Sequence, residues 1–231
     1  MENVKQILER IGSATIGTQN PKIYRMPEYD EPVIVDYPVK SKLDYFGVPK
    51  RFKNSTWEFI RNNSDASDKE RMHKLAQIKE YSDNFKSYLK DGIGLLLKGG
   101  VGTGKTTIAL AVLRDYIDKG GRGYFISAVT LMDEIFNIAD FADRARFESK
   151  LKTVPVLVID DLGAEGSGDM VSRKIAAIIS KRYNDGLVNI ITTNLGVEDL
   201  KRIYDARIYD RLKATCKVFN IVGDSLRKGV N

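Results

Sequence analysis

A glycine-rich run in the middle of the chain has the residue types that are needed to hold phosphate groups. Residues 99–107 have the sequence GGVGTGKTT, which fits the pattern G-x-x-x-x-G-K-[ST]. Glycines let the backbone curl until successive N–H groups point at phosphate oxygens, and a helix that begins at the lysine adds its partial positive charge. We expect Lys105 to reach the β- and γ-phosphates of a nucleotide and the Thr106 hydroxyl to bind Mg²⁺. The predicted nucleotide-binding residues are Gly99, Gly100, Val101, Gly102, Thr103, Gly104, Lys105, Thr106 and Thr107.

Two carboxylates follow a second apolar run. Residues 155–159 predict a buried strand, and Asp160 and Asp161 come directly after it. Asp160, at the tip of the strand, is expected to hold Mg²⁺ through water. Asp161 would then point at the γ-phosphate and orient or deprotonate the attacking water. Glu165 is an alternative general base, and the sequence leaves both open.

An amide ends a third apolar run. Residues 188–192 predict another buried strand, and Asn194 follows it closely. If this strand lies beside the one that carries the carboxylates, Asn194 can hydrogen-bond the attacking water or the γ-phosphate. Asparagine after a strand is also a common turn residue, which is the alternative interpretation.

Two arginines near the end of the chain have helical spacing. Arg207 and Arg211 lie four residues apart and therefore share one face of a helix. Arginines that complete an ATPase site stabilise charge on the transferred phosphoryl group. The alternative is a solvated helix face on which the arginines pair with Asp205 or Asp210.

These residues need a scaffold that brings them together. After Gly92, short apolar runs alternate with amphipathic helices, which predicts an α/β fold with a parallel sheet and helices on both of its faces. The predicted strands are residues 93–97, 123–127, 155–159 and 188–192. The predicted helices are residues 67–90, 106–119, about 130–151 and 171–183.

The first fifty residues differ from the rest. Five of the six prolines fall between Pro21 and Pro49, which predicts a linker or extended arm over residues 13–50 with a short strand at 33–36. A short amphipathic helix is predicted over residues 2–11. We therefore expect two regions, an N-terminal partner-binding helix and arm at 1–50 and the main domain at 51–231.

Composition narrows the class of protein. Of 231 residues 42% are hydrophobic, which is enough for a core, and no apolar run approaches the roughly 18 residues of a membrane helix. The single cysteine, Cys216, cannot form an internal disulfide, so we expect a cytoplasmic protein without a membrane partner.

The net charge of +6 is compatible with a nucleic-acid partner. Residues 136–152 interleave aromatic and basic side chains and are a candidate for binding single-stranded DNA, although burial in the core is the alternative for the aromatic ones. They are Phe136, Phe141, Phe147, Arg144, Arg146, Lys150 and Lys152.

In this order, the motifs resemble those of the DnaC/DnaI-type AAA+ ATPases, which are replicative helicase loaders of bacteria and phages. The IstB-type transposition helper ATPases are their close relatives. The resemblance implies a P-loop NTPase fold of the AAA+ type without a full C-terminal lid. It rests on GVPKRFKNSTW at 47–57, GVGTGKT at 100–106, IDDLGAE at 159–165, TTNL at 192–195, RIYDRL at 207–212 and GDSLR at 223–227.

The resemblance also implies roles for residues and partners. Asn194 corresponds to sensor 1, Arg211 to an arginine finger that acts on ATP bound by a neighbouring subunit, and Arg227 to sensor 2. We therefore expect an ATP- and Mg²⁺-dependent ATPase that self-associates and loads a hexameric replicative helicase onto single-stranded DNA, as part of a primosome in replication initiation or restart. Residues 1–50 would contact the helicase. The alternatives are an IstB-type transposition helper and, further away, a small-molecule P-loop kinase.

Overall fold

The structure is a computed structural model that describes residues 42–166 and 168–223. The chain divides into a unit Met1–Lys42 and a unit Leu43–Asn231, and the second unit carries the fold described below. The predicted helix over residues 2–11, the strand over 33–36 and Arg227 lie outside the described residues.

A parallel sheet forms the centre of the second unit. Its strand order is β2-β3-β4-β1-β5, and every neighbouring pair is parallel. On β1, Leu95 lies opposite Ile190 of β4 and Lys217 of β5. Because the strands are parallel, their carboxyl ends meet at one edge of the sheet, where α/β proteins bind their ligands. The strands are β1 Gly94–Lys98, β2 Gly123–Ser127, β3 Val156–Asp160, β4 Val188–Thr193 and β5 Cys216–Asn220.

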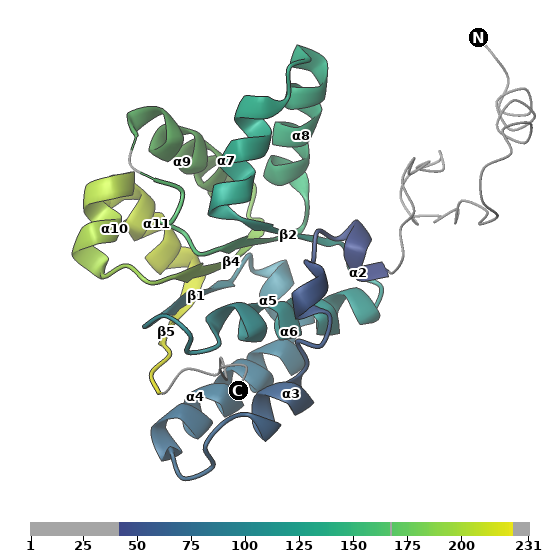
Figure 1. Cartoon of the computed structure of the whole chain (residues 1–231), viewed down its shortest axis with the longest axis vertical. Helices are drawn as coiled ribbons and strands as arrows, with labels where there is room; N and C mark the ends of the chain where they lie inside the picture. Colours follow the sequence, from purple (N-terminus) through teal and green to yellow (C-terminus); the bar gives the residue numbers. More distant parts are fainter. Residues whose placement is uncertain (1–41, 167, 224–231) are drawn as a thin grey trace, which may run out of the picture. The chain divides into compact units, whose positions relative to one another are not determined.

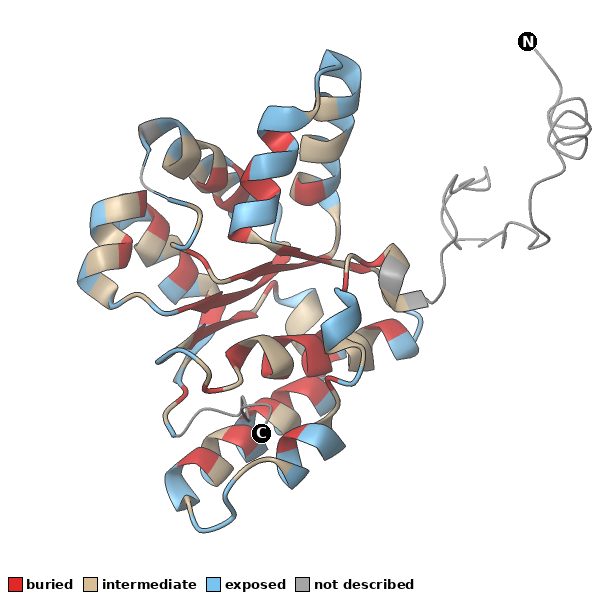
Figure 2. Ribbon diagram, viewed as in Figure 1, coloured by how far each residue is buried: buried red, intermediate tan, exposed pale blue. Residues whose placement is uncertain are grey.

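Helices cover both faces of this sheet (Figure 1). Alternate strand residues point to opposite faces, so Leu95 and Leu97 belong to one core cluster and Leu96 to the other. Figure 2 shows the sheet as a band of buried residues between the two helical layers. The first layer contains α3 Trp57–Asn62, α4 Lys69–Asp83, α5 Phe85–Lys90 and α6 Lys105–Asp118. The second contains α7 Ala128–Asn137, α8 Phe141–Thr153, α9 Asp169–Asn184, α10 Val197–Tyr204 and α11 Ala206–Thr215.

The parallel α/β architecture and the four predicted strands are confirmed, with ends that shift by one residue at most. The helix predicted over residues 67–90 is instead two helices, because α4 ends at Asp83 and α5 begins at Phe85. The predicted helical region at about 130–151 is likewise divided between α7 and α8. Strand β5 was not predicted, because it is a short edge strand that is largely exposed on both faces.

The segment that leads into the sheet domain is packed rather than free. Helix α2, Lys42–Tyr45, and the 3₁₀ turn Lys50–Phe52 flank a stretch in which Phe46 and Val48 are buried in the core. The Phe125 N–H donates a hydrogen bond to the Phe46 carbonyl at 2.8 Å. The boundary between the two units therefore falls after Lys42, earlier than the expected end of the arm at residue 50.

A buried arginine ties the second helical layer to the sheet. Arg182 of α9 is 0% exposed and donates hydrogen bonds to the carbonyls of Leu151, Val154 and Val188 and to Oδ1 of Asn189, at 2.6 to 3.0 Å. Burial lowers the pKa of Arg182 to about 9. These contacts fix the end of α8 against the start of β4. Within residues 42–166 and 168–223, no helix has both the length and the apolar character that a membrane crossing requires.

Candidate active site

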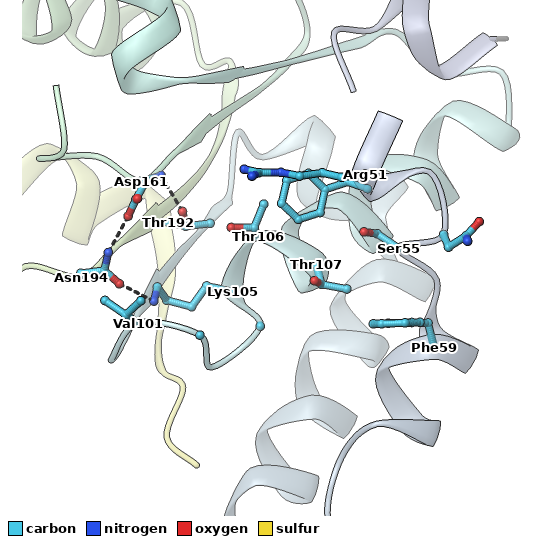
Figure 3. Close-up of a pocket in the computed structure, with 14 residues that line it drawn as sticks. Arg51, Ser55, Phe59, Val101, Lys105, Thr106, Thr107, Asp161, Thr192 and Asn194 are labelled. Atoms are coloured by element: carbon cyan, nitrogen blue, oxygen red, sulfur yellow. Dashed lines mark hydrogen bonds between the residues drawn. The ribbon is translucent and has the colours of Figure 1, made fainter. Parts of the chain in front are cut away.

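Three of the residues predicted to do chemistry gather at the carboxyl edge of the sheet. Lys105 begins the helix after β1, Asp161 follows β3 and Asn194 follows β4, and all three line a cavity of about 290 Å³ (Figure 3). The meeting of these three strand ends follows from the strand order, in which β4 lies between β1 and β3.

The glycine-rich loop has the backbone geometry of a phosphate cradle. Gly102 and Gly104 have φ values of 84° and 89°, in the region that favours glycine. Gly104 precedes α6 and offers no side-chain cap, so the first N–H groups of this helix remain for an anion. A Cβ on Gly99 would lie 2.1 Å from the Ile221 carbonyl oxygen, which explains why a glycine stands there.

All nine predicted loop residues take part in this arrangement. Lys105 is 6% exposed, and its Nζ donates to the carbonyls of Gly99 and Gly100 at 2.9 and 2.7 Å and to Oδ1 of Asn194 at 2.7 Å. Thr103 is buried, and its hydroxyl donates to the Gly100 carbonyl at 3.0 Å. The loop residues that line the cavity are Val101, Gly102, Gly104, Lys105, Thr106 and Thr107.

Asp160, the last residue of β3, and Asp161, which follows the strand, have their carboxylates in different environments. Asp160 is 6% exposed and accepts a hydrogen bond from the Thr192 hydroxyl at 2.7 Å. Burial raises the pKa of Asp160, although hydrogen bonds from Thr192 and Thr106 oppose this shift. A carboxylate joined to a threonine hydroxyl is an all-oxygen donor set of the kind that Mg²⁺ prefers, so Asp160 and Thr106 fit this ion.

Asp161 faces the cavity because the chain turns sharply at this residue. Its φ of 58° lies in the left-handed region, which is rare for a residue other than glycine. Its N–H donates to the Thr192 hydroxyl at 2.8 Å, and its Oδ1 accepts a hydrogen bond from Nδ2 of Asn194 at 2.6 Å. Asn194 therefore bridges Lys105 and Asp161.

Glu165, the alternative base, has a different position. Its Oε2 accepts a hydrogen bond from the Gly163 N–H of its own loop at 2.7 Å. Its Oε1 is buried without a hydrogen-bond partner among the described residues, and burial raises the pKa of Glu165. Asp161 is the one carboxylate among the described residues that line the cavity, so the geometry favours Asp161 as the base.

Several residues that complete the site were not given a role from the sequence. The Thr192 hydroxyl contacts both the Asp160 carboxylate and the Asp161 N–H, as described above. In the sequence, the only signal for Thr192 was its place in the TTNL motif. Arg71 of α4 is 3% exposed and donates to the carbonyls of Thr103 and Val222 at 3.0 and 2.8 Å, with no signal in the sequence. The segment before α3 supplies a whole wall of the cavity, formed by Arg51, Phe52, Asn54 and Ser55 together with Phe59 of α3.

The two spaced arginines lie elsewhere. Arg207 and Arg211 share a face, as their spacing predicts, but they line a separate cavity of about 550 Å³ between α9, α10 and α11. The Arg207 side chain is 80% exposed and pairs with Asp205, with Nη2 and Oδ2 2.8 Å apart. Arg211 is half-buried and donates a hydrogen bond to the Ser180 hydroxyl. The structure therefore brings neither arginine to the cavity that Lys105 lines.

The stretch of interleaved aromatic and basic residues is mixed in its exposure. Phe136 and Phe141 are 48% and 82% exposed, whereas Phe147 packs against the core. Burial in the core is thus the correct interpretation for Phe147 alone. Arg146 pairs with Asp143, and Nζ of Lys150 lies 3.6 Å from the centre of the Tyr124 ring.

The chain is similar to known proteins. Residues 58–230 match the family described as IstB-like ATP binding protein. The replicative helicase loader DnaI of Bacillus subtilis is 26% identical over 170 residues, which are 71% of this chain and 55% of the relative. An ATP-binding protein of insertion sequence IS5376 from Geobacillus stearothermophilus is 26% identical over 188 residues, which are 78% of this chain and 69% of that protein.

The solved structures agree with this match. A crystal structure of the DnaC helicase loader superposes with a TM-score of 0.64 at 29% identity, and covers 75% of this chain and 100% of that one. The chain spans only about half the length of the DnaI relative, at 55%. The chain belongs to the family of IstB-like ATP binding proteins and has the AAA+ P-loop fold of the DnaC and DnaI helicase loaders.

Proposed function

We propose that this protein binds and hydrolyses ATP, and that it uses the nucleotide to load a replicative DNA helicase onto single-stranded DNA. The observation that carries the ATPase is the row of hydrogen bonds from Lys105 through Asn194 to Asp161, which joins the ends of three strands beside a phosphate cradle. The helicase is suggested by the relatives, because both DnaI and DnaC are named as loaders of the replicative helicase.

The geometry supports a direct attack of water on ATP. Asp161 orients the water and takes its proton, the water oxygen bonds to the γ-phosphorus, and the bond to the bridging oxygen of ADP breaks. Lys105 stabilises the charge on the β- and γ-phosphates and Asn194 holds the water or the γ-phosphate. Thr106 and Asp160 would hold Mg²⁺, which neutralises phosphate charge when it is bound.

The second cavity supports completion of the site by another subunit. Arg207 and Arg211 lie away from the phosphate cradle of their own chain, and Arg207 is exposed. We infer that Arg211 acts as the arginine finger on ATP bound by a neighbouring copy, so that hydrolysis requires self-association. Arg227 is proposed to act on the nucleotide of its own subunit.

The DNA and helicase contacts are proposed for different regions. Phe136 and Phe141 lie exposed on α7 and α8, and α8 carries Arg144, Arg146, Lys150 and Lys152, a combination that suits stacking of single-stranded bases. Residues 1–50 are proposed to contact the helicase.

The test of this function is complex formation with the helicase. The protein is mixed with the replicative helicase of its host, with and without ATP, and the mass of the complex is measured by light scattering after size exclusion. We expect a stable complex whose mass depends on nucleotide, and we expect the Lys105→Ala variant to lose the dependence on nucleotide. Absence of a complex in every nucleotide state would refute the loader function.

A transposition helper is the second candidate function. The match to IstB-like proteins and the relative from insertion sequence IS5376 favour it specifically. A helper of this kind would bind duplex DNA and a transposase instead of a helicase. ATP-dependent retention of duplex DNA, together with failure to bind the helicase, would select this alternative.

A further inference from the structure

The segment before α3 brings a second cation to the nucleotide cavity. Among the described residues that line this cavity, Lys105 and Arg51 are the two with a positive charge. Arg51 belongs to the 3₁₀ turn Lys50–Phe52 and lies before residue 58, where the match to the family begins. Arg51 stands in the lead-in segment at residues 47–57, but its place in the cavity follows from the tertiary structure.

The guanidinium of Arg51 is held in place while its N–H groups remain available. Its central carbon lies 4.6 Å from the centre of the Phe52 ring, which is a cation–π contact through the face of the guanidinium. Its N–H groups form no hydrogen bond or ion pair with a residue in the described part of the chain. Within residues 42–166 and 168–223 these five N–H donors have no partner, and their arrangement suits a planar or tetrahedral anion.

The segment that carries Arg51 is itself fixed to the domain. Nη2 of Arg114 on α6 donates a hydrogen bond to the Lys53 carbonyl at 2.5 Å. Nε1 of Trp57 donates to Oδ2 of Asp115, also on α6, at 2.8 Å. Because α6 begins at Lys105, the same helix positions both cations of the cavity.

Arg51 lies on the side of the cavity toward the carboxyl end of β3. It also lines an adjoining cavity of about 230 Å³ whose wall includes Asp160 and Ser127, at the carboxyl ends of β3 and β2. In Figure 3 the Arg51 side chain extends toward the side of Asp161 and away from Phe59. If Asp160 and Thr106 hold Mg²⁺ as expected, the terminal phosphate of a bound nucleotide would lie on this side, which favours the γ-phosphate over the base as the partner of Arg51.

We propose that Arg51 binds the γ-phosphate of ATP held in its own subunit and thereby makes the site selective for the triphosphate over the diphosphate. This inference rests on the proposed ATP binding. It adds a cation that acts within the subunit, in contrast to Arg211, which would act on a neighbour.

The test compares affinities for two nucleotides. Dissociation constants of a non-hydrolysable ATP analogue and of ADP are measured with Mg²⁺ by calorimetry for the wild type and for Arg51→Ala. We expect the variant to bind the analogue about tenfold to 100-fold more weakly, the effect of a lost charge-assisted hydrogen bond, and to bind ADP as the wild type does. Arg51→Lys should recover part of the affinity, because it keeps the charge but not the paired donors.

The neighbouring residue provides a matched control. Lys50 is exposed in the same 3₁₀ turn, and Lys50→Ala should leave both affinities unchanged. Equal weakening of ATP analogue and ADP by Arg51→Ala, or no weakening, would overturn the assignment to the γ-phosphate. A wild type that binds neither nucleotide would instead refute the proposed ATP binding itself.

A mixing experiment separates action within the subunit from action on a neighbour. Excess Lys105→Ala protein, which keeps Arg51 but should not bind nucleotide, is added to Arg51→Ala protein. We expect no recovery of affinity for the ATP analogue. Recovery to the wild-type value would show that Arg51 acts on a neighbouring subunit and would overturn the proposal.

Discussion

The nucleotide cavity and the face formed by α9, α10 and α11 both carry basic residues with a proposed role in ATP hydrolysis, but these residues differ in burial and in their partners. In the cavity, Lys105 is 6% exposed and Thr192 is 1% exposed, and each has its hydrogen-bond partners within the chain. On the helical face, the Arg207 side chain is 80% exposed and its carboxylate partner, Asp205, lies two residues earlier on the chain.

The contrast between a buried, hydrogen-bonded Lys105 and an exposed Arg207 bears on whether a single chain can bind ATP and whether it can hydrolyse it. Polar groups that folding has already oriented need little rearrangement when a nucleotide binds. An exposed ion pair contributes little to folding and is screened by salt, so Arg207 can exchange Asp205 for another anion at small cost. We infer that nucleotide binding belongs to the single chain, whereas full hydrolysis needs a second copy.

The largest expected effect is the loss of ATP binding when Lys105 in the nucleotide cavity is replaced. Lys105→Ala removes the charge and its hydrogen bonds to Gly99, Gly100 and Asn194, and we expect ATP affinity to fall about 1,000-fold. Lys119→Ala, an exposed lysine just after the same helix, is the control and should bind normally. Titration with a fluorescent ATP analogue measures both, and retention of micromolar affinity by Lys105→Ala would remove the phosphate cradle from this loop.

Replacing Arg211, on the face formed by α9, α10 and α11, tests whether ATP hydrolysis needs a second copy of the chain. We expect Arg211→Ala to bind ATP like the wild type while the assembled form hydrolyses it about 100-fold more slowly, because charge on the transferred group is no longer stabilised. Steady-state phosphate release is measured over a range of protein concentrations. Arg202→Ala, which removes a 77% exposed arginine of α10, is the control. If Arg211→Ala slowed hydrolysis by the dilute monomer as much as by the assembled form, the proposal that Arg211 acts on a neighbouring copy would be wrong.

Thr192 sharpens the comparison inside the cavity. Thr192→Val leaves the Asp161 N–H and the Asp160 carboxylate without their shared hydroxyl, so we expect hydrolysis to fall about tenfold and stability by about 1–3 kcal/mol. Thr193→Val is a matched control, since its buried hydroxyl also has two partners, the Leu162 carbonyl and the Leu195 N–H. Chemical denaturation should show similar losses for both variants, while only Thr192→Val should lose most of its activity. Equal activity losses would mean that Thr192 serves the fold alone.

The smallest expected effect is on thermal stability, because the folded protein keeps the Asp160 carboxylate buried. Burial raises its pKa in the folded protein, so the wild type loses stability as pH rises from the unfolded value of about 3.9 through the folded one. Asp160→Asn escapes this loss and, without Mg²⁺ or nucleotide, should melt about 2–4 °C higher at pH 8, for about 1 kcal/mol. Thermal unfolding at pH 8 and at about pH 3.5, below the unfolded value, should show a smaller difference at the lower pH. A difference that grew as pH fell would contradict the direction of the shift.

Much of the fold and of the site could be predicted because the signals are local. The alternation of apolar runs and amphipathic helices predicted the parallel sheet, and polar residues directly after three strands must meet where parallel strands end together. Lys105, Asp161 and Asn194 are therefore neighbours because each follows one of three adjacent parallel strands, β1, β3 and β4. The split of the helix over residues 67–90 at Asn84 was missed, because the apolar spacing continues across the break.

The sequence by itself determined the phosphate cradle, its two carboxylates and the amide, since each is a short motif attached to a strand. Only the tertiary structure decided that Arg51 lines the same cavity as Asp161, that Thr192 joins the carboxylates, and that β5 closes the sheet beside β1. It also decided that Phe141 is exposed while Phe147 is packed. These facts depend on contacts between segments far apart along the chain, and no local pattern of residue types encodes such contacts.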